Sequence, residues 1–337
     1  MIYLKNDYSA GAHPKVLQAL VDTNMENTVG YGDDPYSVEA RDLIRDLIKC
    51  PSANIYFTMA GTQTNLTILA ALLRPHQAII AASTGHICVH EAGAIEATGH
   101  KVIHVPTSDG KLLPEHIDQV IEQHCNAHWV QPKLVFISNL TETGLVYNKT
   151  ELVALREKCD QYGLYLYMDG ARLAMALSHK DCDLTFADLP KYLDAFYIGG
   201  TKCGILMGEA IVLINSSFND GFVSLMKQRG AILAKGRLLG IQFKEILSDN
   251  LYLELGAYAN RLSEKLVDGI TAKGYKFNFT PCSNMIFPIF PMDLIKSLDG
   301  KVEYDDMIDF HDGTGSIRLV TSWSTKEDEI DQFLDLI

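Results

Sequence analysis

The segment LYLYMDGAR, residues 164–172, places an apolar run directly before an aspartate. Residues 164–168 are apolar or aromatic on both faces of an extended chain. A strand of this kind is typical of a parallel sheet that helices cover on both sides. Ligands of such sheets bind beyond the carboxyl ends of the strands. The segment therefore predicts an α/β domain and places Asp169 at its candidate site.

Short apolar runs alternate with amphipathic stretches on both sides of this segment. This alternation predicts an α/β fold with a mostly parallel sheet. We expect strands over 54–58, 77–82, 100–105, 133–138, 194–198 and 210–214, and helices over 62–73, 87–98 and 149–162.

The pattern changes after residue 216, and the chain of 337 residues is longer than the roughly 250–300 at which single cores stop growing. We predict a large domain over 1–245, including an N-terminal segment 1–35, and a small C-terminal α+β domain over 246–337. The expected elements here are helices over about 220–247, 251–273 and 304–310 and from 326 onward, and strands over 275–279, 284–290 and 316–320.

The charge balance and the cysteines limit the class of protein. Lys and Arg total 29 and Asp and Glu total 42, giving a net charge of −13 that argues against nucleic-acid or membrane partners. The seven cysteines are scattered and form no Cys-x-x-Cys pair, which favours reduced thiols in a cytoplasmic protein. We expect neither a signal peptide nor a membrane span, because the sequence has no basic-then-apolar leader and no run of 18 apolar residues.

A lysine follows a second predicted strand, in YIGGTKCG, residues 197–204. Taken alone, Asp169 is equally well a helix cap, and Lys202 is more simply a surface turn residue. Together, 33 residues apart and each just past a strand of one sheet, they are the pair that pyridoxal phosphate needs. The lysine forms a Schiff base with the aldehyde, and the carboxylate keeps the pyridine nitrogen protonated.

Gly61 and Thr62 lie between a predicted strand and a helix, where free backbone N–H groups can bind a phosphate. Simple capping of the helix by Thr62 is the alternative. The segment is not a Walker A loop, and no Gly-x-Gly-x-x-Gly follows the first strand, so ATP and dinucleotide binding are disfavoured.

Two further residues are candidates with simpler alternatives. His86 follows the predicted strand 77–82 and could stack on a cofactor ring, although a lone histidine is more often an ordinary polar residue. Arg318 lies mid-strand, where its planar guanidinium suits a carboxylate ligand or a structural ion pair.

In this order, these motifs resemble the threonine aldolase branch of the β-eliminating lyases, which are pyridoxal-phosphate enzymes of the aspartate-aminotransferase-like fold type I. The resemblance runs nearly end to end, and Asp-Gly-Ala-Arg at 169–172 and Ile-Arg-Leu-Val-Thr at 317–321 are its most specific parts. Its other segments are 4–7, 31–35, 61–62, 86–87, 91–94 and Lys202.

The resemblance implies a role for each matched residue. It implies that Lys202 carries the cofactor, that Asp169 pairs with the pyridinium nitrogen and that His86 stacks on the ring and takes part in catalysis. The residues implied to bind pyridoxal 5′-phosphate are Gly61, Thr62, His86, Asp169, Arg172 and Lys202.

The resemblance also implies the substrate and the assembly. Arg172 and Arg318 would bind the carboxylate of an amino acid, with Asn6 beside it. The protein would be a lyase that breaks the Cα–Cβ bond of a β-hydroxy-α-amino acid, converting threonine to glycine and acetaldehyde. The resemblance further implies a homodimer or homotetramer whose active sites are shared between subunits.

The sequence departs from the family in three places. Asn6 replaces the usual serine, and Thr141 replaces the histidine that helps to recognise the threonine hydroxyl. The family's glycine-rich segment with a Met-Arg pair is matched loosely by 227–237, where Arg229, Lys235 or Arg237 takes the basic role.

These departures leave the general base open among His86, a bound water and the cofactor phosphate. They also leave open a β-elimination or an aldol cleavage of a different amino acid. A non-catalytic binding protein that kept the fold is the alternative of another class.

Overall fold

The computed structural model describes residues 1–180 and 182–337, and its largest element is a seven-stranded sheet of order β2-β8-β7-β6-β5-β3-β4. Strands β4, β3, β5, β6 and β7 run parallel, whereas β8 is antiparallel to both of its neighbours. The predicted mostly parallel sheet is therefore confirmed. Its strands are β2 Asn54–Thr58, β3 Gln77–Ala82, β4 Lys101–Val105, β5 Gln131–Ser138, β6 Tyr165–Asp169, β7 Ala195–Gly199 and β8 Glu209–Leu213.

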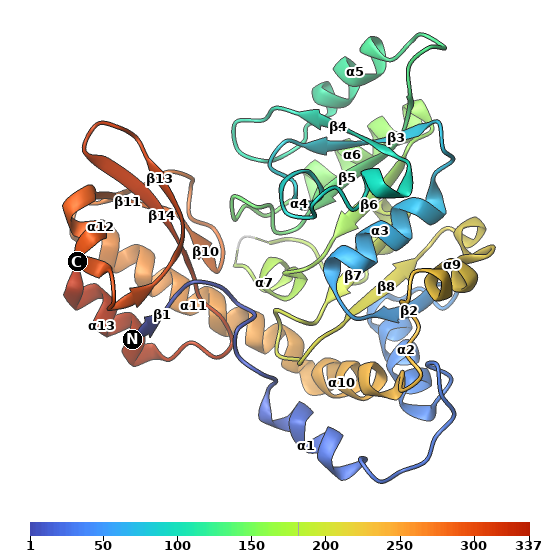
Figure 1. The fold of residues 1–337 in the computed structure, drawn as a ribbon, viewed down its shortest axis with the longest axis horizontal. Helices are drawn as coiled ribbons and strands as arrows, with labels where there is room; N and C mark the ends of the chain where they lie inside the picture. The colour runs from blue at the N-terminus through green and yellow to red at the C-terminus, as the bar shows by residue number, and fades with distance from the viewer. Residues whose placement is uncertain (181) are drawn as a thin grey trace.

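Helices cover both faces of this sheet (Figure 1), and its central strands β6, β7 and β8 are almost entirely buried. In β3, Ile80 packs in one apolar layer with α2, α6 and α10, and Ile79 packs in the other with α3 and α9. Within residues 1–180 and 182–337, no helix is both long and apolar enough to cross a bilayer. The helices around this sheet are α1 Pro14–Asp22, α2 Pro35–Ile48, α3 Gly61–Leu72, α4 His86–Val89, α5 Pro114–Gln123, α6 Lys149–Tyr162, α7 Leu173–Leu177, α8 Leu189–Tyr192, α9 Phe222–Gln228 and α10 Arg237–Leu247.

The helix predicted over 149–162 is confirmed as α6, and both of its ends are capped. The Asn148 side chain accepts the Glu151 N–H, and the Glu151 carboxylate accepts the Asn148 N–H in return. This reciprocal arrangement satisfies two backbone donors at the start of the helix. Gly163 ends it in the left-handed conformation, with φ of 62°.

The helix predicted over 87–98 is wrong as a single element. The chain forms only the short α4 and a 3-10 turn at Glu96–Thr98. Ala92 and Gly93 between them have φ of 50° and 73°, and this left-handed backbone cannot continue a right-handed helix.

The helix predicted over 220–247 is also interrupted. Its two parts are α9 and α10, separated by a turn in which Gly230 has φ of 68°. The apolar periodicity continues through this turn, so it does not reveal the break.

The C-terminal part forms a second sheet of order β10-β14-β11-β9, in which β13 also pairs with β14 (Figure 1). The helix predicted over 304–310 is wrong, because β13 occupies this stretch in antiparallel pairing with β14. Only four residues separate β13 from β14, so pairing within this hairpin overrides the helical pattern of the stretch. The elements are β9 Lys276–Phe277, β10 Met285–Ile286, β11 Pro288–Pro291, α12 Met292–Leu298, β13 Asp305–Asp309, β14 Thr314–Val320 and α13 Glu327–Leu336.

The chain's first strand joins this C-terminal part. β1 (Ile2–Tyr3) pairs in parallel with β12 (Val302–Glu303), so the N-terminus lies beside the C-terminal helix (Figure 1). The 22-residue α11 (Leu251–Ala272) packs against the main core at its start and against the C-terminal core at its end. The domain boundary after residue 245 stays a prediction.

The carboxyl ends of β6 and β7 approach each other closely at Gly170. The Gly199 N–H donates to the Gly170 carbonyl at 3.0 Å. A Cβ atom at residue 170 would lie 1.9 Å from the Tyr197 carbonyl oxygen. Only glycine therefore fits directly after Asp169.

Replacing this glycine tests the packing of the sheet edge. We expect Gly170→Ala to lower the free energy of unfolding by about 3 kcal/mol, because rigid backbone cannot make room for the methyl group. The matched control is Gly163→Ala, where φ is 62° but no atom lies within 4 Å. This control should lose only about 1–2 kcal/mol from left-handed strain. Urea denaturation measures both, and equal losses would contradict the described contact.

Candidate active site

A cavity of about 430 Å³ opens at the carboxyl ends of β6 and β7. It brings together six of the eight predicted site residues from four separate segments of the chain. These six are Gly61, Thr62, His86, Asp169, Arg172 and Lys202. The other lining residues are Tyr8, Met59, Ala60, His90, Leu140, Glu142, Ala171, Tyr197, Thr201 and Glu209.

The buried carboxylate of Asp169 lies at the base of the cavity. Its Oδ1 accepts hydrogen bonds from the Tyr197 hydroxyl at 2.5 Å and from the Ala171 N–H at 3.0 Å. Its Oδ2 accepts one from the Asn65 amide at 3.1 Å. Such bonds compensate the loss of water around a buried charge and fix its orientation.

Asn65 extends this network toward His86. The Asn65 amide also donates to Glu91 Oε1 at 2.7 Å, and the same oxygen lies 2.7 Å from His86 Nδ1. Burial opposes the charged imidazole, but the Glu91 hydrogen bond and the nearby carboxylates outweigh it and raise the pKa of His86. The Tyr167 hydroxyl donates to the Asn65 carbonyl at 2.8 Å, which fixes the amide.

Arg172 is fixed by a buried ion pair. Its Nε and Nη2 donate to the Asp7 carboxylate at 2.6 and 3.1 Å, and both residues are less than a tenth exposed. Burial would raise the pKa of Asp7, but the charges of Arg172 and Lys202 outweigh it and the pKa is lowered. The Asn284 amide also donates to Asp7, at 3.1 Å. The pair therefore joins the N-terminal segment and the C-terminal part to the cavity wall.

The start of α3 has the features of an anion site. Its N-cap residue, Ala60, makes no side-chain cap, so the expected alternative of capping by Thr62 does not occur. A Cβ atom at Gly61 would lie 3.2 Å from the Tyr197 hydroxyl. The uncapped N–H groups of this 12-residue helix therefore suit a phosphate at the cavity wall.

Glu209 secures the loop that carries Lys202. Its buried carboxylate accepts the Gly200 N–H at 3.0 Å and the Thr201 hydroxyl at 2.8 Å. Burial raises the pKa of Glu209 to about 8, even though the nearby Lys202 opposes this shift.

Two predicted substrate residues do not line this cavity. Arg318 lies on β14, where its Nη2 donates to Asp305 at 2.7 Å. Asn6 bonds to the Tyr3 hydroxyl and the Tyr8 N–H instead. Their roles stay predictions.

The basic segment 227–237 also lies outside the lining. Arg237 donates to the carbonyl oxygens of Glu26 and Asn24 at 2.9 and 3.1 Å. Which of Arg229, Lys235 and Arg237 takes the family's basic role stays open.

Sequence reasoning assigned no role to several residues of the site. Asn65 follows Gly61 by four residues and so shares its helix face, and Tyr197 lies on the strand that leads to Lys202. Both positions could therefore be recognised from the sequence. Asp7 lies in the matched segment 4–7 but was given no role, and Glu209 gave no signal, since the contacts of both depend on long-range folding.

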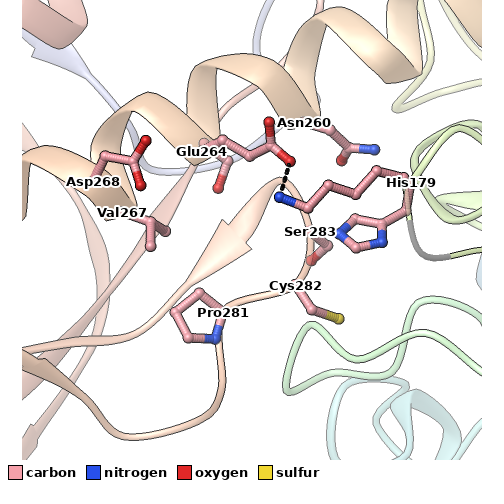
Figure 2. A pocket seen from close by; sticks show the side chains of 10 residues that line it. His179, Asn260, Glu264, Val267, Asp268, Pro281, Cys282 and Ser283 are labelled. Atoms are coloured by element: carbon pink, nitrogen blue, oxygen red, sulfur yellow. Dashed lines mark ion pairs between the residues drawn. The ribbon is translucent and has the colours of Figure 1, made fainter. Parts of the chain in front are cut away.

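A second cavity, of about 270 Å³, lies between α11, the end of α7 and residues 281–283 (Figure 2). Lys180 and Glu264, which both line this cavity, form an ion pair at 3.0 Å (Figure 2). It contains none of the predicted site residues, which distinguishes it from the cavity around Lys202.

Comparison with known proteins assigns the family. The sequence profile of the β-eliminating lyases matches residues 4–280. The chain belongs to the β-eliminating lyase family. It is 30% identical over 324 residues to the low specificity L-threonine aldolase of Pseudomonas aeruginosa, covering 95% of this chain and 92% of that protein.

Solved structures agree with this assignment. The threonine aldolase of Leishmania major is 44% identical, with a TM-score of 0.99 over 100% of this chain and 98% of that one. The histidinol-phosphate aminotransferase of Clostridium acetobutylicum, 14% identical, matches with a TM-score of 0.75 over 100% of this chain and 98% of that one. The predicted aspartate-aminotransferase-like fold type I is therefore confirmed.

Glu209→Gln tests the buried carboxyl of this lyase-family site. In the unfolded chain a glutamate ionises near its usual pKa of 4.5, whereas in the folded protein Glu209 stays protonated up to about pH 8. The wild type therefore loses stability relative to the variant as pH rises through this window. We therefore expect the variant to become more stable relative to the wild type between pH 5 and pH 8. The measurement is the free energy of unfolding of each protein, and the variant's value minus the wild-type value should increase with pH. A difference that is independent of pH would contradict the assignment.

Proposed function

We propose that this protein is a pyridoxal-5′-phosphate-dependent aldehyde-lyase that cleaves threonine and related β-hydroxy-α-amino acids to glycine and an aldehyde. The observation that carries the proposal is one cavity that contains both Lys202 and the buried Asp169. Two relatives that align over nearly the whole chain are named threonine aldolases, which supports the choice of substrate class.

The side chains present fit the cofactor. Asp169, held by three donors, would pair with the ring nitrogen, and His86 would lie against the ring. Gly61 and Thr62 at the uncapped start of α3 would bind the phosphate, and Lys202 would carry the aldehyde carbon. When bound, pyridoxal phosphate supplies an electron sink for the pair released at Cα.

Arg172 would orient the substrate carboxylate, because its buried pair with Asp7 fixes the guanidinium at the cavity wall. Arg318 and Asn6 complete the proposed substrate set on the resemblance alone. A fixed carboxylate limits the rotation of the substrate and so selects which bond at Cα is broken.

Self-association and a cytoplasmic location are part of the proposal. All seven cysteines are free thiols, as expected in a reducing compartment.

Large apolar side chains are exposed on α1 and after it, at Leu17, Val21, Met25 and Val29. Their exposure supports a dimer or tetramer, because self-association would remove this apolar surface from water.

A related β-elimination or a different aldol substrate is the second candidate. Thr141, which replaces the family histidine that helps to recognise the threonine hydroxyl, favours this candidate. Its own hydroxyl bonds to Thr143, and it does not line the cavity. The presence of Lys202 and Asp169 in one cavity argues against a non-catalytic binding protein.

A product assay tests the proposal. We expect threonine to yield glycine and acetaldehyde in equal amounts, and Lys202→Ala to lower turnover by about 10³-fold or more, because the cofactor loses its attachment. Lys296→Ala, on the exposed surface of α12, is the matched control and should match the wild type. Keto acid and ammonia as the main products would favour elimination, and full turnover by Lys202→Ala would contradict the proposal.

A further inference from the structure

The loop after β5 presents its side chains alternately to the protein interior and to the cavity. Thr141 and Thr143 are buried, and their hydroxyl groups lie 2.8 Å apart. Thr141 Oγ1 also accepts the Leu145 N–H at 2.9 Å, and the Thr143 hydroxyl donates to the Asp109 carbonyl at 2.5 Å. Neither threonine lines the cavity, whereas Glu142 between them does.

Glu142 is one of three carboxylates that line the cavity. Asp169 is held by Tyr197 and Asn65, and Glu209 is held by the backbone and the hydroxyl of its own loop. In the part of the chain that the structure describes, the Glu142 carboxylate makes no hydrogen bond or ion pair. It is therefore the carboxylate in this cavity that can accept a proton from a ligand.

Glu142 faces the residues expected around an amino-acid substrate. Its negative charge raises the pKa of both His86 and Arg172. Lys202, His90 and Tyr8 line the same cavity. The carboxylate therefore lies in the same region as the cation proposed to bind the substrate carboxylate.

The other basic groups are less suited to accept a proton. His86 Nδ1 is bound to Glu91, and the raised pKa of His86 favours its protonated form. Arg172 is a cation and cannot accept a proton. Lys202 is proposed to carry the cofactor and is therefore not free to act as the base. The remaining competitor is His90, whose ring centroid lies 5.5 Å from that of His86.

From this geometry we propose that Glu142 binds the β-hydroxyl group of the substrate and accepts its proton as the Cα–Cβ bond breaks. The inference rests on the proposed function and assigns the general base that the substitution at Thr141 left open. The proton passes from the hydroxyl to a Glu142 oxygen, and the O–H electron pair becomes the second C–O bond of the aldehyde. The Cα–Cβ pair stays with Cα, where a proton replaces Cβ in glycine, so nothing is oxidised or reduced overall.

The test compares two reactions that share the cofactor site but differ in their need for this base. Threonine cleavage requires removal of the hydroxyl proton, whereas exchange of the glycine α-proton in D2O does not. We expect Glu142→Gln to lower kcat for threonine by about 10²-fold or more, the usual contribution of a general base. Its glycine exchange rate, followed by NMR, should stay within about threefold of the wild type, since no hydroxyl proton is transferred.

Two further variants serve as controls. Glu122→Gln, at an exposed position on α5, should match the wild type in both reactions. Glu142→Asp keeps the carboxylate and should retain more threonine cleavage than Glu142→Gln.

The imidazole titration of His86, followed by NMR on the full chain, gives a readout that does not depend on turnover. Because Glu142 raises the pKa of His86, this pKa should be lower in Glu142→Gln than in the wild type and unchanged in Glu122→Gln. An unchanged titration in Glu142→Gln would show that the carboxylate does not face His86 and would overturn the proposal.

The remaining outcomes are also decisive. Threonine cleavage that persists in Glu142→Gln would overturn the proposal, and selective loss in His90→Asn instead would assign the base to His90. Loss of glycine exchange together with cleavage in folded Glu142→Gln would show a general role in the site and would also overturn it. A wild type that catalyses glycine exchange but no aldol cleavage would refute the proposed function separately.

Discussion

The organisation of the site depends on the buried carboxylate of Asp169. A charge at the buried end of a central strand is costly unless donors surround it. Here the donors come from three elements: Tyr197 from β7, Asn65 from α3 and the Ala171 N–H from the following turn. The same interaction therefore aligns the start of α3 and the strand that leads to the lysine loop.

A buried ion pair connects the N-terminal segment and the C-terminal part to this edge of the sheet. Asp7 comes from the N-terminal segment, Arg172 follows β6, and Asn284 precedes β10. Breaking such a pair leaves one buried charge uncompensated, at a cost of about 3–5 kcal/mol. The need to keep Arg172 paired thus also fixes the N-terminal segment beside the cavity.

The sequence predicted the parts of the fold and site that depend on local pattern. Apolar runs located the strands of the main sheet, and the rule that ligands bind at strand carboxyl ends brought Asp169 and Lys202 to one cavity. The helix predicted over 304–310 is wrong because antiparallel pairing with β14, the next strand along the chain, overrides the helical pattern of the stretch itself. Glu142 could not be predicted for a similar reason, since its exposure to the cavity follows from the tertiary contacts of the threonines beside it.

The central claim is that Lys202 and Asp169 together form a pyridoxal-phosphate site. Borohydride reduction of the protein as purified with cofactor, followed by peptide mass mapping, tests it most directly, because reduction fixes the cofactor to the lysine that carries it. The account predicts one pyridoxyl-phosphate mass addition, on the peptide that contains Lys202. Labelling of a different lysine, or a folded protein that takes up no cofactor, would contradict it.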